Sequence, residues 1–111
     1  MELDMRVYEE LKQATGADFI DELVDTYLDD APRLMQELKS SLEAQDAETF
    51  RRAAHSLKSN SATFGANGLS GMARELEMLA RDNKLPEAAA RLPAVEEALH
   101  VVEAELKGLR A

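Results

Sequence analysis

Apolar residues recur at intervals of three and four along nearly the whole chain, and this spacing constrains the fold more than any other feature. Such a period places apolar side chains on one face of an α-helix, whereas the alternation of period two that is typical of strands is absent. Aromatic residues make up only 5% of the 111 residues, and Ala, Leu, Glu, Lys and Arg dominate. The sequence therefore predicts an all-α fold, and its length predicts a single domain over residues 1–111.

Turn and capping residues divide the first half of this pattern into two helices. A short helix is predicted over about residues 4–14, and Gly16 suits the position just after its C-terminus. Asp18 is the expected N-cap of the second helix, which ends before the turn at residues 44–45. Pro32 lies within that helix, but the apolar spacing continues past it, so we expect a bend rather than a break.

Three further helices follow. The third is predicted to begin at the cap Asp46 and to end near Phe64, and a turn at residues 65–68 leads into the fourth. The fourth ends at residues 83–84, and the last has Pro86 in its first turn. Four long helices with short connections favour an antiparallel up-and-down four-helix bundle, with the short N-terminal helix covering one end. The side chains expected to face the core are Leu3, Val7, Leu11, Phe19, Leu23, Tyr27, Leu34, Leu38, Leu42, Phe50, Leu57, Phe64, Leu69, Met72, Leu76, Leu79, Val95, Leu99, Val102 and Leu106.

Charge and composition exclude several classes of function. The formal net charge is −9, so a nucleic acid would be repelled. The chain has no cysteine, which excludes disulfides and cysteine-ligated zinc. No apolar run approaches the ~20 residues that a membrane span requires, and the acidic start does not resemble a secretory signal. We therefore expect a cytoplasmic protein with no membrane insertion.

His55 is predicted to lie on the polar side of the third helix. At about 100° per residue, it stands roughly 160° from Leu57, which faces the core. Residues three and four positions away contact a given residue on a helix surface. At His55 these neighbours are Arg51, Arg52, Lys58 and Ser59. An exposed imidazole surrounded by cations and one small residue predicts a site for a phosphoryl group.

The chemistry expected of His55 is nucleophilic. A neutral imidazole, with an ordinary pKa of about 6.5, attacks an electrophilic phosphorus and becomes phosphohistidine. Lys58 would neutralise part of the charge of about −2 that the phosphoryl group brings. Ser59 and Ala62 are small, so a partner's active site could approach the ring. The remaining candidates for contact with the phosphate or with a partner are Arg51 and Arg52.

The machinery of an independent enzyme is not apparent in the sequence. There is no Ser-His-Asp constellation, no nucleotide-binding signature and no glycine-rich phosphate loop, because Gly65 and Gly68 do not fit one. His100 lies far from His55 in the sequence, so we expect an ordinary surface residue and no metal site. Glu77 is expected to be a solvated surface acid, with a place at the rim of the site as the alternative. We therefore expect a carrier that binds no cofactor.

At this point the sequence resembles a known family. The segments 54–59, 61–62, 64–66 and 76–77 are similar to the signature of bacterial histidine-containing phosphotransfer (HPt) domains. That signature is His, any residue, a large apolar residue, Lys, then Gly or Ser, with a Gly some ten residues after the His. The matching positions are His55, Leu57, Lys58, Ser59 and Gly65. Asn60 departs from the pattern, since Ser or Ala is commoner there.

The resemblance implies an intermediate in a multistep phosphorelay. A response-regulator receiver domain carrying phospho-aspartate would dock on the face that shows His55. The phosphoryl group would pass to His55, steadied by Lys58, and then to a second receiver, with the magnesium ion held by the receiver. Such domains occur free or as the tail of a hybrid sensor histidine kinase, and we expect a monomer. The role expected for Gly65 is relief of backbone or packing strain.

Three alternatives remain open from the sequence. The first is a substrate domain that the ATP-binding domain of a histidine kinase phosphorylates directly. The second is a helical adaptor that binds a partner without carrying phosphate. The third is a small hydrolase with His55 as general base, which would require a concave pocket lined by converging polar groups.

Overall fold

The computed structural model describes residues 1–110, and within them the chain is helical with no strand. This confirms the all-α prediction of one short helix followed by four long ones. The five helices are α1 (Met5–Thr15), α2 (Ala17–Glu43), α3 (Ala47–Thr63), α4 (Asn67–Arg81) and α5 (Leu85–Leu109). The helix α4 begins inside the predicted turn at residues 65–68, so that turn is shorter than expected.

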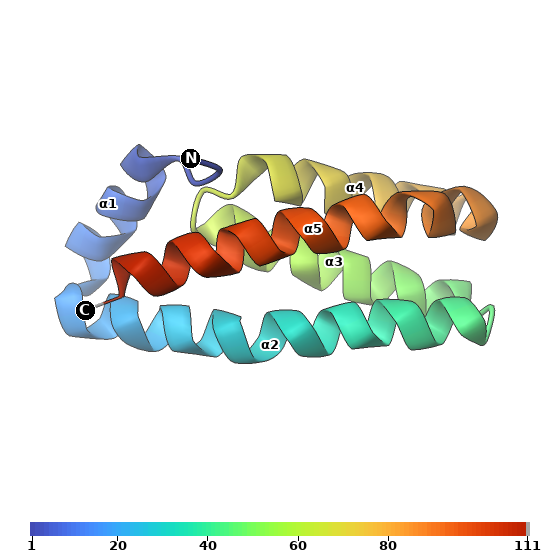
Figure 1. The fold of residues 1–111 in the computed structure, drawn as a ribbon, viewed down its shortest axis with the longest axis horizontal. Helices are drawn as coiled ribbons and strands as arrows, with labels where there is room; N and C mark the ends of the chain where they lie inside the picture. Colours follow the sequence, from blue (N-terminus) through green and yellow to red (C-terminus); the bar gives the residue numbers. More distant parts are fainter. Residues whose placement is uncertain (111) are drawn as a thin grey trace.

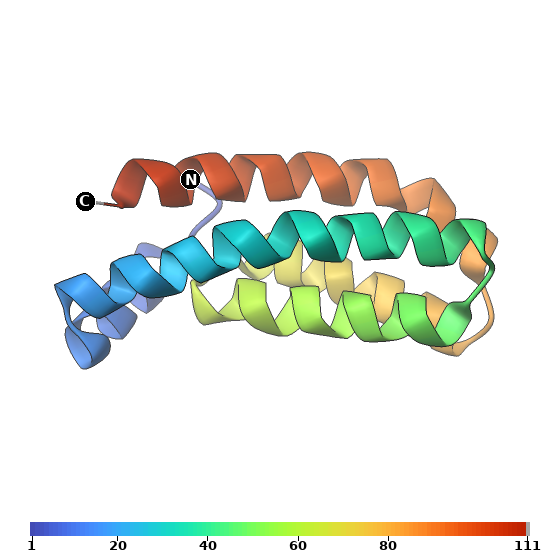
Figure 2. The ribbon, with the colours of Figure 1, turned by 90° about the horizontal axis from the view of Figure 1, so that it is seen from below.

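The four long helices form an elongated bundle (Figure 1), and the molecule measures 41 × 20 × 20 Å along its principal axes. In chain order, α2 leads away from the end that carries α1, α3 returns to it, α4 leads away again and α5 returns. Contacts join α2 to α3, α3 to α4, α4 to α5 and α5 to α2, which closes the bundle around one core. The short helix α1 contacts α2 at one end of the molecule, and Figure 2 shows this end from a second direction.

The core follows the predicted apolar spacing in most helices. The largest side chains that are almost fully buried are Phe50, Ile20, Leu38, Leu57, Leu69, Leu76, Leu99 and Leu106. Several residues expected inside are only half-buried, namely Val7, Leu11, Leu23, Leu42, Met72 and Leu79. At all of these positions except Leu11, an adjacent residue is buried instead, and in α4 this residue is a small one, Ala73 or Ala80.

One core assignment is wrong. Phe19 was expected to face inward, but 44% of its surface is exposed. The buried line of α2 instead passes through Ile20 and Val24, and Phe19 is displaced from that line by about 100°. An exposed aromatic side chain at the start of α2 is therefore a surface feature that the apolar spacing alone did not reveal.

Carboxylates cap two of the helices. Asp4 accepts a hydrogen bond from the backbone N–H of Arg6 at the start of α1, and Asp46 accepts one from Thr49 at the start of α3. The prediction for Asp18 is wrong, because α2 begins at Ala17 and has no side-chain cap. Asp18 lies in the first turn instead, where its charge is favourable beside the positive end of the helix dipole.

Both internal prolines lie within continuous helices. α2 runs from Ala17 to Glu43 through Pro32, as the uninterrupted apolar spacing predicted. α5 likewise continues through Pro93, and Pro86 occupies its first turn. Each long helix therefore extends along the bundle as one element.

Gly65 lies where the N-terminal segment crosses the turn between α3 and α4. Its φ of 79° belongs to the left-handed region that favours glycine. A Cβ atom here would lie 2.8 Å from the carbonyl oxygen of Asp4 and 2.9 Å from Cβ of Val7, both too close. The carbonyl of Gly65 also accepts a hydrogen bond of 2.8 Å from the backbone N–H of Asp4. The glycine thus permits the close approach that seats the N-terminal segment on the bundle.

Candidate functional site

His55 projects from the solvent side of α3. Its side chain is 56% exposed, whereas Leu57, two residues later, is completely buried. This is the opposition that the helical period predicted. The apolar line on the far side of α3, which includes Phe50, fixes the rotation of the helix and therefore presents the imidazole to solvent.

A carboxylate from the neighbouring helix contacts both His55 and Lys58. Oε2 of Glu77 in α4 lies 2.8 Å from Nδ1 of His55, and its Oε1 accepts a hydrogen bond of 2.8 Å from Nζ of Lys58. The side chain of Glu77 is only 16% exposed. The expectation of a solvated surface acid is therefore wrong, and the alternative place at the rim of the site holds.

The ionisation of Glu77 determines which nitrogen of His55 is available. Burial raises the pKa of the Glu77 carboxyl, but hydrogen bonds and charges from Lys58 and His55 outweigh burial and bring it below its ordinary value. At neutral pH the group is thus a carboxylate, which only accepts hydrogen bonds. Nδ1 of His55 must then carry the proton, so a neutral ring keeps its lone pair on Nε2.

Lys58 is held on the same side of the bundle as His55. Its side chain is 28% exposed, and its ammonium shares one carboxylate with the imidazole. The backbone carbonyl of Lys58 also accepts a hydrogen bond of 2.9 Å from Oγ of Ser70, which ties α3 to α4 at this level. A positive charge therefore stands beside the exposed ring.

Arg51 and Arg52 are turned toward an acid of their own helix. Nη2 of Arg51 lies 2.7 Å from Oε1 of Glu48, and its Nε donates a second bond of 3.2 Å to Oε2. Nε of Arg52 lies 4.0 Å from the same carboxylate. Their charges are therefore partly neutralised in the free protein, and the hydrogen-bond partner of the His55 imidazole is Glu77 rather than either arginine.

The remaining predicted residues lie as their spacing requires. Ser59 and Ala62 are exposed on α3, four and seven residues after His55, so they lie along the same face of the helix. Gly65 belongs to the turn after α3 rather than to this face. His100 is exposed on α5, in a different helix from either His55 or Glu77.

The arrangement combines an exposed imidazole, a carboxylate that orients it and a lysine ammonium bound to the same carboxylate. No group of three potential metal ligands occurs among residues 1–110. No helix in this part of the chain is long and apolar enough to cross a membrane. The pockets between the helices lie elsewhere, and the one that contains a histidine is lined by His100.

Comparison with known proteins gives matches to one family. The family model of the Hpt domain matches residues 22–110. The crystal structure of histidine-containing phosphotransfer protein B (HptB) from Pseudomonas aeruginosa PAO1 is similar, with a TM-score of 0.93 and 34% sequence identity. That alignment covers 98% of this chain and 94% of the other. Among curated protein sequences, none gave a significant match.

Proposed function

The chain belongs to the Hpt domain family of phosphotransfer carriers in two-component signalling, and on this premise we propose that His55 is its phosphoacceptor. One observation carries the proposal. The ring of His55 is exposed, and its Nδ1 is bound to the Glu77 carboxylate that also binds Lys58. This contact fixes the tautomer and leaves Nε2 as the nucleophile.

In the proposed step, Nε2 of His55 attacks the phosphorus of an aspartyl phosphate on a receiver domain. The N–P bond forms, the bond between phosphorus and the aspartyl oxygen breaks, and the aspartate leaves as a carboxylate. The proton on Nδ1 stays in the hydrogen bond to Glu77, whose negative charge balances the positive charge that the ring acquires. Transfer to the aspartate of a second receiver reverses these changes.

Lys58 has the second role in this proposal. Its ammonium stands one turn from His55 and is shared with Glu77, so it can also pair with a phosphoryl oxygen on the ring. Ser59 and Ala62 leave the approach to Nε2 open. We assign Arg51 and Arg52 to contact with the partner. Their pairing with Glu48 holds them near His55, but neither arginine is bound to the imidazole.

The proposed partners are receiver domains of response regulators, alone or within a hybrid sensor histidine kinase. The receiver would hold the magnesium ion that phosphoryl transfer requires, and this chain would bind no cofactor of its own. We further propose that the carrier acts in the cytoplasm as a monomer. The acidic net charge of −9 supports solubility and association with a basic surface on a partner.

Labelling with a phosphorylated receiver tests the proposal. A receiver charged with acetyl phosphate and magnesium is mixed with the chain, and the label is expected on His55 as an acid-labile, alkali-stable phosphate. His55→Gln should take up no label, and equal labelling of that variant would refute the assignment. An isolated kinase catalytic domain with ATP, used as an alternative donor, separates relay from direct phosphorylation.

A further inference from the structure

Within residues 1–110, Ser70 makes the hydroxyl-to-carbonyl hydrogen bond that joins two helices. Its Oγ, in α4, donates to the backbone carbonyl of Lys58 in α3 at 2.9 Å. The other hydroxyls with such a bond donate to a carbonyl of their own helix, three or four residues earlier, and they are Thr15, Thr26, Ser40, Ser41 and Thr63. Because Lys58 lies inside α3, its carbonyl also accepts the bond of the helix, and the Ser70 hydroxyl uses the second lone pair.

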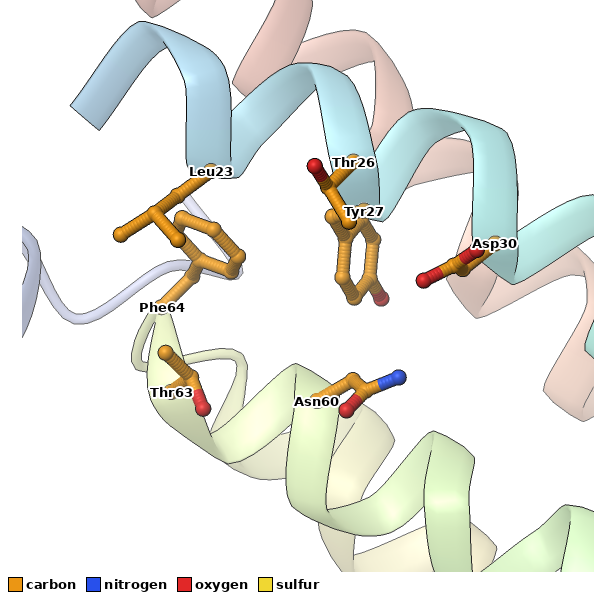
Figure 3. Close-up of a pocket in the computed structure, with 7 residues that line it drawn as sticks. All are labelled: Leu23, Thr26, Tyr27, Asp30, Asn60, Thr63 and Phe64. Atoms are coloured by element: carbon orange, nitrogen blue, oxygen red, sulfur yellow. The ribbon is translucent and has the colours of Figure 1, made fainter. Parts of the chain in front are cut away.

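The helix α3 packs differently against its two neighbours. Toward α2 there is a groove of about 190 Å³, and the rings of Tyr27 and Phe64 that line it pack edge to face (Figure 3). On α4, two of the four buried residues are the alanines Ala73 and Ala80. Small side chains allow helix axes to approach closely. The short side chain of Ser70 can therefore reach the main chain of α3.

α4 holds Lys58 at both of its ends. Ser70 binds the carbonyl of Lys58, and Glu77 accepts a hydrogen bond of 2.8 Å from its ammonium. Ser70 and Glu77 are seven residues apart, close to two full turns, so both face α3. The same Glu77 carboxylate lies 2.8 Å from Nδ1 of His55. The bond of Ser70 is thus part of the attachment that brings Glu77 to the imidazole.

The turn between α3 and α4 does not by itself determine where Glu77 lies. Glu77 comes ten residues after Asn67, the first residue of α4, which places it about 15 Å along the helix axis. A pivot of about 10° at the turn would move a residue at that distance by about 2.6 Å. Such a shift is nearly the length of the hydrogen bond between Glu77 and His55. A restraint on α4 beyond the turn is therefore needed.

Apolar packing restrains this pivot less than a hydrogen bond does. The burial of apolar surface has no directional preference, and alanines form shallow ridges that interlock weakly. A hydrogen bond weakens steeply when its angle departs from linear. Ser70 is half-buried and lies one turn into α4, so its bond to Lys58 restrains the helix between the turn and Glu77.

We propose that Ser70 is a positioning residue for phosphoryl transfer. Its bond to the carbonyl of Lys58 holds α4 where Glu77 keeps the proton on Nδ1 of His55, so that Nε2 remains the nucleophile. Ser70 acts through Glu77, because its own bond is to the main chain of α3 rather than to the ring. The inference rests on the proposed function for its effect on transfer, whereas the placement of Glu77 can be measured without phosphate.

The test compares the wild type with Ser70→Ala, Ser70→Thr and Ser41→Ala. Alanine removes the hydroxyl and is a better helix former than serine, so Ser70→Ala should fold. Threonine restores a hydroxyl at the same position. Ser41→Ala is the matched control, because buried Ser41 bonds only carbonyls of its own helix.

Nitrogen-15 NMR of the imidazoles gives the first measurement. At about pH 8.5 the rings are neutral, and the spectrum reports which nitrogen carries the proton. The His100→Gln variant identifies the signals of His55. The proton should lie on Nδ1 in the wild type, Ser70→Thr and Ser41→Ala, whereas part of the Ser70→Ala population should carry it on Nε2. A wild-type distribution in Ser70→Ala would overturn the inference.

Single-turnover transfer from a receiver charged with acetyl phosphate and magnesium gives the second measurement. Ser70→Ala should lower the maximal rate constant about threefold, because a supporting contact of the reacting group is lost. The receiver concentration for the half-maximal rate should stay within twofold, since docking is unchanged. Labelling by phosphoramidate, a small donor, should fall by the same factor. Ser70→Thr should recover the rate, and Ser41→Ala should match the wild type.

The Glu77→Gln background decides whether Ser70 acts through Glu77. The double variant should transfer phosphate at the rate of Glu77→Gln alone, because the contact that Ser70 positions is already lost. A further threefold decrease would overturn the inference and leave His55 as acceptor. If no donor labels His55 in the wild type, the proposed function fails, and the NMR measurement still decides whether Ser70 positions Glu77.

Discussion

Two lysine–glutamate pairs join helices of this bundle, and only one belongs to a candidate site. Lys58 and Glu77 connect α3 to α4 at 2.8 Å, whereas Lys39 and Glu96 connect α2 to α5 at 2.6 Å. Glu77 is 16% exposed and Glu96 is 30% exposed. The two pairs are otherwise alike in chemistry and geometry, so an interhelical ion pair by itself does not mark a functional site.

A histidine lies near each pair. The two places differ in whether the glutamate and the histidine come from the same helix. Glu77 comes from a different helix than His55, so its carboxylate reaches across and contacts Nδ1 at 2.8 Å. His100 lies on the same helix as Glu96, four residues later, and both line a hollow with Lys39. Yet His100 makes no hydrogen bond or ion pair with residues 1–110. A carboxylate supplied by a second helix is therefore what orients an exposed imidazole here.

Removing each histidine in turn is the strongest test of whether the two places differ in function. His55→Gln should lower phosphate labelling from a charged receiver by at least 100-fold, because an amide nitrogen is not a nucleophile. His100→Gln should label like the wild type. The measurement is the amount of alkali-stable phosphate on each variant. Loss of labelling in both variants would mean that the change acts through the fold rather than through one ring.

Removing each lysine should give a smaller difference in the rate of phosphoryl transfer between the two pairs. Lys58→Ala should slow transfer about tenfold, equivalent to about 1.4 kcal/mol, which is the order expected for one hydrogen bond to a charged group. Lys58→Arg should recover part of the rate because the charge is restored. Lys39→Ala is the matched control on the other pair and should transfer at the wild-type rate. Single-turnover kinetics with one charged receiver compare all three variants, and a normal rate for Lys58→Ala would remove this lysine from the proposed step.

Glu77→Gln should change both transfer and the pH dependence of stability. A neutral amide no longer enforces the proton on Nδ1, so a severalfold slower transfer is expected. Because folding lowers the pKa of Glu77, its carboxylate contributes stability that is fully present above the ordinary carboxyl pKa of about 4.3. That contribution is lost as the pH falls through the lower pKa of the folded state. Urea unfolding of both proteins between pH 7 and pH 2.5 should show a constant difference that shrinks below about pH 4.3. A difference independent of pH would contradict the assigned ionisation.

Much of the fold could be predicted because helix periodicity is a local property. The spacing of apolar residues and the cap Asp46 placed the long helices to within a few residues. The errors arise where local spacing leaves a choice open. Phe19 and Ile20 are both apolar and adjacent, and only contact with the other helices decides which one faces inward. The cap at Asp18 failed because the helix starts one residue earlier, at Ala17.

The part of the site that lies on α3 could be predicted from the sequence, but the contribution of α4 could not. The exposure of His55 and the proximity of Lys58 follow from spacing on α3. The role of Glu77 depends on the position of α4 along the axis of α3. The spacing of residues within either helix does not determine that position. Its position after buried Leu76, within the segment that resembles the family, was the one available signal. The pairing of Arg51 with Glu48, three residues apart, was open to prediction from spacing alone.

The smallest expected effect concerns the stability that the two ion pairs contribute. Double-mutant cycles, with each lysine and glutamate changed singly and together, isolate the coupling energy from other effects of the substitutions. For Lys39 and Glu96, which are 44% and 30% exposed, the coupling in the free energy of unfolding should be about 0.5 kcal/mol or less. For Lys58 and Glu77 it should approach about 1 kcal/mol and persist better in salt, because less water reaches that pair. Equal couplings would show that burial at this level does not strengthen the pair, and that Glu77 matters through the tautomer of His55 alone.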